Sequence, residues 1–165
     1  ILICMGRPIL YWQERMGLDD NMFRMVKFRT MIPDAEKMGA ASTEKNDTRV
    51  TPLGLILRKF RLDELPQFFN VLTGEMSIIG PRPEYSILVE DFMKNIPLFQ
   101  IRHWLRPGIT GWAQVNLGYA YASSQEEMKE KIRYDLFYLK NLSFWLDLII
   151  ICRTFMTILT GFGSR

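Results

Sequence analysis

The apolar run of residues 144–159, FWLDLIIICRTFMTIL, most constrains how this chain can fold. Asp147 and Arg153 interrupt the run, and no stretch of about 18 uncharged apolar residues occurs in the sequence. A charge near the middle of a bilayer is costly, so a membrane span is an unfavourable interpretation. We therefore expect residues 143–161 to form an apolar helix that lies at an interface or packs on the rest of the domain.

The composition suits one domain over residues 1–165, because 48% of the residues are hydrophobic and can build a sizeable core. The net charge of +3 is too small for a nucleic-acid binder, so no nucleic-acid partner is expected. Cys4 and Cys152 have no metal-ligand spacing and indicate reduced thiols in a cytosol-facing compartment. With His103 as the single histidine, catalysis would depend on carboxylates, Arg and Lys, with Mg²⁺ if a metal is used.

Local patterns predict a helix-dominated α/β domain of the α+β type with a small sheet. The first half of the chain indicates two strands within 10–31 around the turn at 17–20, and then a polar loop over 33–50 with room for one helical turn. A helix from Thr51-Pro52 to about 60 and a strand at 76–79 follow. The second half indicates helices over 85–95 and 97–105, a constrained loop leading into a strand over 106–116, and a helix from the capping box Ser124-x-x-Glu127 to about 140.

Residues 61–70, RLDELPQFFN, place two adjacent carboxylates between a basic run and an apolar stripe. The apolar positions recur at the i, i+3, i+4 and i+7 spacing of a helix that Thr73-Gly74 closes. These positions are Leu65, Phe68, Phe69 and Leu72. We predict that Asp63 is the N-cap of this helix, with Pro66 in the first turn, where its missing N–H costs nothing.

The cap position would give the two acids different chemistry. The helix dipole and the free N–H groups would keep Asp63 ionised and therefore nucleophilic. Glu64 would point elsewhere and could bind a divalent cation, which relieves the repulsion between the two carboxylates. The alternative is a plain cap with a solvated neighbour, and the two residues taken alone favour that alternative.

Three basic motifs are candidates for phosphate binding. Arg82 stands between two prolines that fix its backbone and aim its guanidinium, although a turn whose Arg pairs with a surface acid fits equally well. Lys27 and Arg29 share one strand face, which suits a diphosphate, although a solvated face is the commoner meaning of this pattern. The basic run at 58–61 has the same interpretations, with membrane phosphate in addition.

The aromatic residues favour packing over ligand binding. The four tryptophans and the many Met and Phe residues are typical of a core or of a membrane interface. His103 has an aromatic neighbour and basic flanks, and we interpret it as structural.

Five motifs, taken together and in order, resemble one family over nearly the whole chain. They are KFRTM at 27–31, LDELPQFFNVLTGEMS at 62–77, IGPRPE at 79–84, RPGITGWAQVN at 106–116 and YDLFYLKNLSFWLDL at 134–148. The sequence is similar to the bacterial sugar transferases, the monotopic polyprenyl-phosphate phosphoglycosyl transferases. Its YDLFYLKN segment and its ending LTGFGSR look most like the exopolysaccharide branch.

The resemblance implies transfer of a sugar-1-phosphate from a UDP-sugar to undecaprenyl phosphate, with release of UMP, as the first membrane step of glycoconjugate synthesis. It also implies that Asp63 forms a covalent phosphosugar intermediate and that Glu64 is a Mg²⁺ ligand. Arg82 would hold the substrate phosphates, helped by Lys27 and Arg29. The implied location is the cytoplasmic face of the bacterial inner membrane, with the domain on the membrane surface.

Family members carry a membrane-inserted helix before the region that matches residues 1–8. Since ILICMG opens within an apolar run, we expect residues 1–8 to be the end of such a helix, otherwise truncated. A non-catalytic membrane scaffold and a nucleotide-sugar-binding regulator are the rival functions. The sugar and the oligomeric state, a homo-oligomer included, stay open; residues 33–50 and 118–124 are where we expect the sugar hydroxyls to be read.

Overall fold

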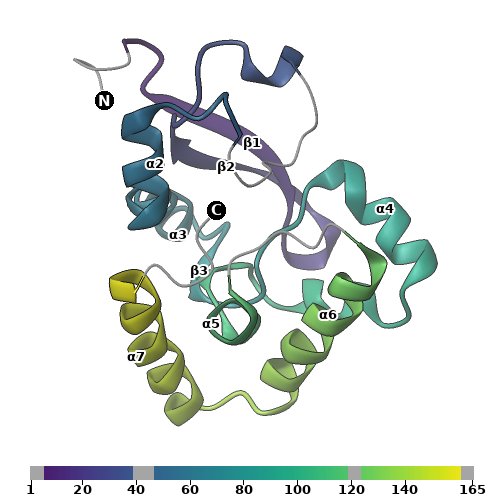
Figure 1. Ribbon diagram of the computed structural model, residues 1–165. Coiled ribbons are helices and arrows are strands. Elements are labelled where there is room, and N and C mark those ends of the chain that lie inside the picture. The colour runs from purple at the N-terminus through teal and green to yellow at the C-terminus, as the bar shows by residue number, and fades with distance from the viewer. Residues whose placement is uncertain (1–5, 39–46, 119–123, 161–165) are drawn as a thin grey trace.

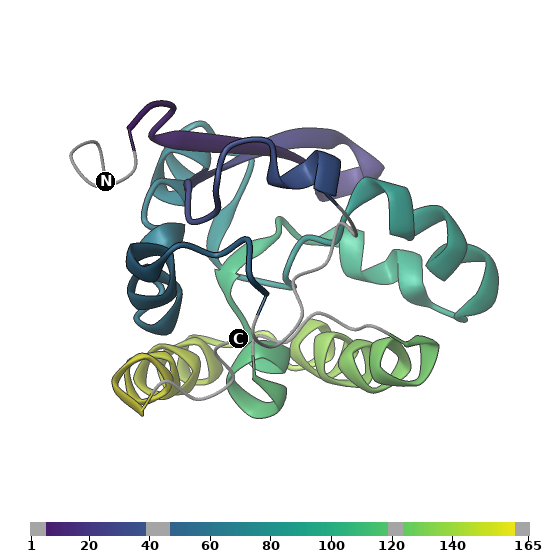
Figure 2. The ribbon, with the colours of Figure 1, turned by 45° about the horizontal axis from the view of Figure 1, so that its top comes forward.

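The computed structural model describes residues 6–38, 47–118 and 124–160. A β-hairpin lies at one end of the molecule, and three helices from the last third of the chain lie along the opposite side (Figures 1 and 2). The hairpin joins β1 (Leu10–Met16) and β2 (Met22–Phe28) through a 3₁₀ turn, η1 (Leu18–Asp20). Its antiparallel register runs from Leu10 opposite Phe28 to Met16 opposite Met22. The two strands predicted within residues 10–31 are therefore confirmed.

Two predicted helix starts are confirmed by their capping hydrogen bonds. The Thr51 hydroxyl accepts from the Gly54 N–H at 3.0 Å before α2 (Pro52–Lys59). Ser124 accepts from the Glu127 N–H at 3.1 Å before α6 (Gln125–Lys140). Both caps are local features, since the hydroxyl and the amide it satisfies lie three residues apart.

A core cluster joins α6 to the middle of the chain. Val89 and Phe92 on α4 (Ser86–Asn95) and Phe99 on η4 (Phe99–Trp104) pack with Met128 and Ile132 on α6. The two helices expected over 85–95 and 97–105 are thus present, the second as a 3₁₀ helix. The expected helical turn within 33–50 is η2 (Ala35–Met38), while residues 39–46 of that segment lie outside the described residues.

The second half of the segment 106–116 is a helix, so the strand expected there is wrong beyond Thr110. β4 (Gly108–Thr110) pairs in parallel with β3 (Ser77–Ile79), and α5 (Trp112–Leu117) follows at once. A Cβ at Gly111 would collide with the Gly80 carbonyl oxygen, so the two backbones approach closely at this point. The part of the chain that the structure describes also contains two two-stranded sheets, where a single small sheet was expected.

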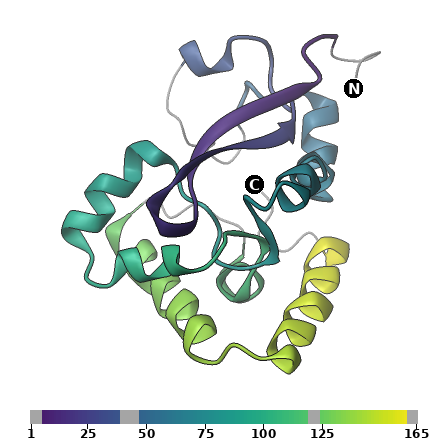
Figure 3. The same ribbon diagram turned by 180° about the vertical axis from the view of Figure 1, so that it is seen from behind.

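Helix α5 lies between α6 and α7 (Phe144–Thr160), which diverge from each other (Figure 3). Val115 on α5, Tyr138 on α6 and Ile150 on α7 form a core cluster there. The C-terminal helix expected over 143–161 is confirmed as far as Thr160, and Gly161 lies outside the described residues. Within residues 6–38, 47–118 and 124–160, no helix combines the length and the apolar character needed to cross a bilayer.

The segment with the two acids differs from its prediction. Asp63 and Glu64 lie in a 3₁₀ turn, η3 (Leu62–Glu64), and Pro66 takes the N-cap position of α3 (Gln67–Leu72). Asp63 is therefore not the cap. Arg61, in the left-handed conformation with φ of 57°, separates η3 from α2.

The apolar stripe of this segment faces outward. The four apolar side chains at helical spacing are exposed: Leu65 (49%), Phe68 (47%), Phe69 (66%) and Leu72 (82%). Apart from Pro66, the buried positions of the segment are polar: Asp63, Glu64, Gln67 and Asn70. Asn70 explains part of this inversion, because its amide bonds the Val26 N–H at 3.1 Å and the Arg24 carbonyl at 2.9 Å on β2. The structure thus places both acids on the inner face.

Candidate active site

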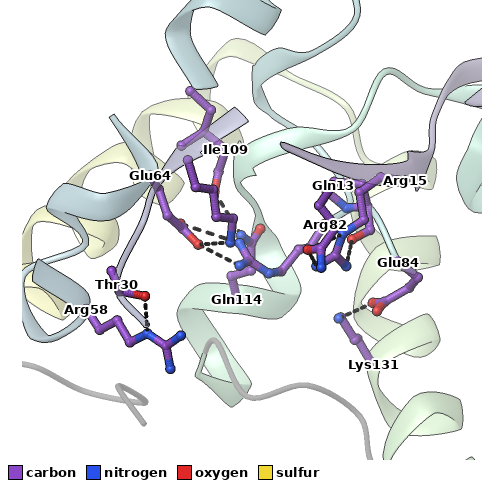
Figure 4. Close-up of polar contacts among 12 residues, drawn as sticks. Gln13, Arg15, Thr30, Arg58, Glu64, Arg82, Glu84, Ile109, Gln114 and Lys131 are labelled. Atoms are coloured by element: carbon purple, nitrogen blue, oxygen red, sulfur yellow. Dashed lines mark hydrogen bonds and ion pairs between the residues drawn. The ribbon is translucent and has the colours of Figure 1, made fainter. Parts of the chain in front are cut away.

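Glu64 is the centre of a buried ionic cluster that joins three separate parts of the chain. Its Oε1 accepts from Arg82 Nη2 at 2.6 Å and from Lys27 Nζ at 3.1 Å. Lys27 comes from β2, and Arg82 comes from the Pro81-Arg82-Pro83 turn between β3 and α4. Figure 4 shows Arg82 reaching from this turn to Glu64, with Gln114 of α5 close by.

The two cations keep Glu64 ionised. Burial by itself raises the pKa of this carboxyl, but the positive charges of Arg82 and Lys27 outweigh burial and hold the pKa well below its usual range. A negative charge is therefore fixed beside Asp63 throughout the neutral pH range.

Asp63 lies in a different electrostatic environment. Burial and the neighbouring negative charge of Glu64 raise the pKa of Asp63, although Lys27, Arg58 and Arg61 oppose this shift. Its Oδ1 is buried and has no hydrogen-bond partner among the described residues. The predicted reason for an ionised Asp63 does not hold, since Pro66 and not Asp63 takes the N-cap position of α3. Once ionised, a poorly solvated carboxylate of raised pKa is a stronger nucleophile than an ordinary one.

The other basic candidates lie at different distances from the acids. Arg29 is buried, and its Nη2 donates to the Gly6 carbonyl at 3.0 Å. Arg58 donates to Thr30 Oγ1 at 2.9 Å, and its charge acts on Asp63. Lys27 and Arg82 therefore form ion pairs with Glu64 directly. Arg58 acts on the acid pair through its charge, which opposes the rise in the pKa of Asp63.

A second buried charge cluster lies behind the turn and was missed from the sequence. Glu84 Oε1 accepts from Lys131 Nζ and forms an ion pair with Arg102 Nη1 at 3.4 Å. Arg102 Nη2 also lies 2.9 Å from Asp135 Oδ2. Burial raises the pKa of Glu84, but Lys131 and Arg102 reverse this and lower it to about 2. The spacing of Lys131 and Asp135 by one helical turn was the available signal, but that spacing is also common on solvated helices.

His103 is structural in its contacts, as predicted. It is buried, its Nδ1 lies 2.6 Å from Asp20 Oδ1, and its ring meets Phe99 edge-on. Burial lowers the pKa of His103, although Asp20 opposes the shift. Trp112 stacks on Phe137, whereas Trp12, Trp104 and Trp145 are exposed.

The acid pair fits a hard cation that shares its ligands with a substrate. Among the described residues no group of three or more His, Cys, Asp or Glu side chains could hold a metal by itself. Mg²⁺, however, commonly takes one or two carboxylates and completes its shell with water and substrate phosphates. Asp63 Oδ1 is unpartnered among the described residues, and the contact of Glu64 Oε2 with Arg82 is long at 3.5 Å. These two oxygens are candidate ligands for such an ion.

A buried acid pair opposed by an arginine and a lysine defines a site suited to phosphate-bearing substrates. Comparison with known proteins agrees with this class. The family model described as bacterial sugar transferase matches residues 1–161. The chain belongs to the bacterial sugar transferase family, which confirms the resemblance of its motifs.

Three relatives illustrate the relationship. The UDP-N-acetylgalactosamine-undecaprenyl-phosphate N-acetylgalactosaminephosphotransferase of Aeromonas hydrophila is 49% identical over 158 residues, which cover 96% of this chain and 37% of the relative. The UDP-glucose:undecaprenyl-phosphate glucose-1-phosphate transferase of Klebsiella pneumoniae is 43% identical, over 96% of this chain and 33% of the relative. The uncharacterized sugar transferase EpsL of Bacillus subtilis is 38% identical, over 97% of this chain and 74% of the relative. The chain thus spans about a third of the length of the first two relatives.

Proposed function

We propose that this chain is a phosphoglycosyl transferase that moves a sugar-1-phosphate from a UDP-sugar to undecaprenyl phosphate and releases UMP. The observation that carries the proposal is the position of Asp63, whose buried Oδ1 has no hydrogen-bond partner among the described residues and lies beside the cluster of Glu64, Lys27 and Arg82. The relatives named for this reaction in Aeromonas hydrophila and Klebsiella pneumoniae support it.

The reaction takes place in two displacements. An oxygen of the ionised Asp63 carboxylate attacks the β-phosphorus of the UDP-sugar, and the bond from that phosphorus to the UMP oxygen breaks. The resulting aspartyl phosphosugar is then attacked by a phosphate oxygen of undecaprenyl phosphate, which regenerates the Asp63 carboxylate. This division lets a water-soluble donor and a lipid acceptor use one site in turn.

The surrounding residues stabilise charge during both displacements. Arg82 and Lys27 are the nearest cations, and the guanidinium of Arg82 can donate two parallel hydrogen bonds to a phosphate. A Mg²⁺ ion held by Asp63 and Glu64 would neutralise phosphoryl charge when bound. Glu64, fixed as an anion by its two cations, also keeps the pKa of Asp63 raised.

Release of UMP tests this function. The chain is incubated with Mg²⁺, undecaprenyl phosphate and a panel of donors that begins with UDP-N-acetylgalactosamine and UDP-glucose, the donors in the relatives' names. Acceptor-dependent UMP release with one donor is the expected result. Absence of UMP with every donor would favour a non-catalytic scaffold or a nucleotide-sugar-binding regulator.

The rate should depend on pH through Asp63. The attack requires the ionised carboxylate, and burial with the Glu64 charge raises the pKa of Asp63 in the folded protein. Activity should therefore fall on acidification at a pH above the ordinary carboxyl range, which is centred at about 4. A profile of kcat/KM against pH measures this limb, and a limb in the ordinary range would contradict the raised pKa.

The outward apolar surface suits a membrane location. In Figures 1 and 3, α2, α3 and α7 lie along one side of the molecule and α4 lies along the other. The exposed apolar side chains of α7 and of the segment from α2 to α3 are Leu55, Ile56, Phe60, Leu62, Leu65, Phe68, Phe69, Leu72, Phe144, Trp145, Leu148, Ile149, Phe155, Met156 and Leu159. Apolar patches of this kind with basic flanks bind anionic lipid surfaces. The proposed location is the cytoplasmic face of the bacterial inner membrane.

Two exposed residues of α3 test the membrane surface. Replacement of Phe69 and Leu72 by Ser should weaken binding to phosphatidylglycerol vesicles by about tenfold, because two large apolar side chains no longer enter the lipid. The melting temperature should hardly change, since these side chains are 66% and 82% exposed. Ile87→Ser on α4 is the matched control, as Ile87 is 81% exposed on the other side. Equal loss of vesicle binding in the control would contradict the assignment.

A further inference from the structure

Among the described residues, donors from other elements hold the three carbonyls of the Pro81-Arg82-Pro83 turn and the carbonyl of Glu84, which follows it. The Pro81 carbonyl accepts from the Gly108 N–H at 2.9 Å, and the Glu84 carbonyl accepts from the Met16 N–H at 3.3 Å. The two carbonyls between them are held by side chains. Arg102 Nη2 donates to the Arg82 carbonyl at 2.7 Å, and Arg15 Nη1 donates to the Pro83 carbonyl at 3.0 Å.

The guanidinium groups of Arg102 and Arg15 supply hydrogen-bond donors that the backbone of the turn lacks. Proline has no N–H, so Pro81 and Pro83 cannot donate a hydrogen bond that would brace the turn internally. Residues 80–84 are also buried, so their carbonyls are shielded from bulk water. A buried carbonyl without a partner is costly, and the two arginines satisfy the positions nearest to the Arg82 side chain.

Both arginines are themselves fixed. Arg15 is fully buried, its guanidinium lies 3.5 Å from the centre of the Tyr85 ring, and its Nη2 donates to Gln13 Oε1 at 2.6 Å. Arg102 is 2% exposed and is tied to Glu84 and Asp135 by ion pairs of 3.4 and 2.9 Å. In Figure 4, Arg15 lies beside Arg82 on the side away from Glu64, and Glu84 and Lys131 lie beyond it.

Burial of two guanidinium groups is an expensive way to hold a turn, because each charge must be desolvated and then paired. A rigid backbone does, however, fix the direction of a side chain that extends from the turn to the acid pair. Arg82 is that side chain, since its Nη2 reaches Glu64 Oε1 at 2.6 Å while its own carbonyl is held by Arg102.

We propose that Arg102 and Arg15 are positioning residues that aim Arg82 at the substrate diphosphate by holding the carbonyls of Arg82 and Pro83. This inference rests on the proposed function, in which Arg82 binds the phosphates. Helix α6 takes part through Asp135 and Lys131, which anchor Arg102 and its partner Glu84. The ionic cluster behind the turn would then support phosphate binding through the position of Arg82.

Arg102→Lys and Arg15→Lys test the proposal, with UDP as the diphosphate probe and uridine as the probe that lacks phosphate. Lysine keeps the positive charge but has one nitrogen on a flexible stem, so it cannot hold a carbonyl and keep the other contacts of the planar fork. Each variant should bind UDP about tenfold more weakly, because a misplaced phosphate donor loses its geometry. The affinity for uridine should not change. Tyr138→Phe, which removes a partly buried 2.8 Å hydrogen bond to Asp147, is the control for loss of stability alone.

Double variants with Arg82→Ala separate the role of Arg102 from that of Arg82. If Arg102 acts through Arg82, Arg102→Lys should cause no further loss of UDP affinity once Arg82 is removed. Parallel loss of UDP and uridine affinity, additive losses, or unchanged UDP affinity in both lysine variants would overturn the positioning role. If Arg82→Ala itself leaves UDP affinity unchanged, the phosphate role of Arg82 in the proposed function fails, and the positioning proposal fails with it. Should Arg102→Lys not fold, Arg15→Lys carries the same test.

Discussion

Asp63→Asn should abolish the covalent phosphosugar adduct. When the chain is incubated with its UDP-sugar and Mg²⁺ but without acceptor, the intact mass of the wild type should increase by the mass of one phosphosugar. Asparagine has nearly the same shape but no carboxylate to attack phosphorus, so the variant should show no increase. Turnover should fall by at least about a thousandfold, as expected for loss of a covalent nucleophile.

Loss of activity should accompany a gain of stability, which separates this result from misfolding. The pKa of Asp63 is raised in the folded state, so ionisation of this carboxyl is less favourable in the folded protein than in the unfolded chain. Above the raised pKa, the charge on Asp63 therefore lowers the free energy of unfolding. An uncharged asparagine side chain at this position would remove the cost. Asp63→Asn should therefore melt at a higher temperature than the wild type at neutral pH, and the difference should vanish as the pH falls below the ordinary carboxyl pKa of about 3.9. An undiminished adduct in the variant would rule out Asp63 as the nucleophile.

The sequence predicts helix ends better than it predicts which side of a helix is buried. The caps at Thr51 and Ser124 are contacts between near neighbours, so the sequence contains both partners of each bond. The stripe that includes Phe69 and Leu72 also has helical spacing, but spacing identifies a face without saying what it meets. Here the polar face carries Asp63 and Glu64 inward, and the apolar face is left outside.

The sequence also predicts only those residues of the candidate site that stand in a local motif. Glu64, Lys27 and Arg82 each stand out in a short motif, and the structure brings all three together. Arg15 and Arg102 stand in no such motif. Their function depends on contacts with the turn across 68 and 20 residues of sequence, which no local pattern records. The residues that contact the expected substrate could be predicted from motifs, whereas those that hold Arg82 in place required the fold.

The environment of Glu64 changes what removal of Arg82 should do. Arg82→Ala should lower kcat/KM. The loss should correspond to about 2–4 kcal/mol of transition-state stabilisation, as for removal of one preorganised donor to a developing negative charge. The same change leaves the buried Glu64 carboxylate with Lys27 as its remaining ion-pair partner among the described residues. Removal of one partner from a buried ion pair typically costs about 3–5 kcal/mol, so Arg82→Ala should also unfold more readily.

A second change separates the two effects. Glu64→Gln added to Arg82→Ala removes the carboxylate that Arg82 had paired, so the double variant should recover much of the lost stability, measured as its free energy of unfolding in urea. Its kcat/KM for UMP release should remain low, because the guanidinium that binds the phosphates is still absent. Glu64→Gln alone is the control for any loss of metal binding. Wild-type kcat/KM in a folded Arg82→Ala protein would reject the role of Arg82, and recovery of activity together with stability would show that Arg82 serves only to neutralise Glu64.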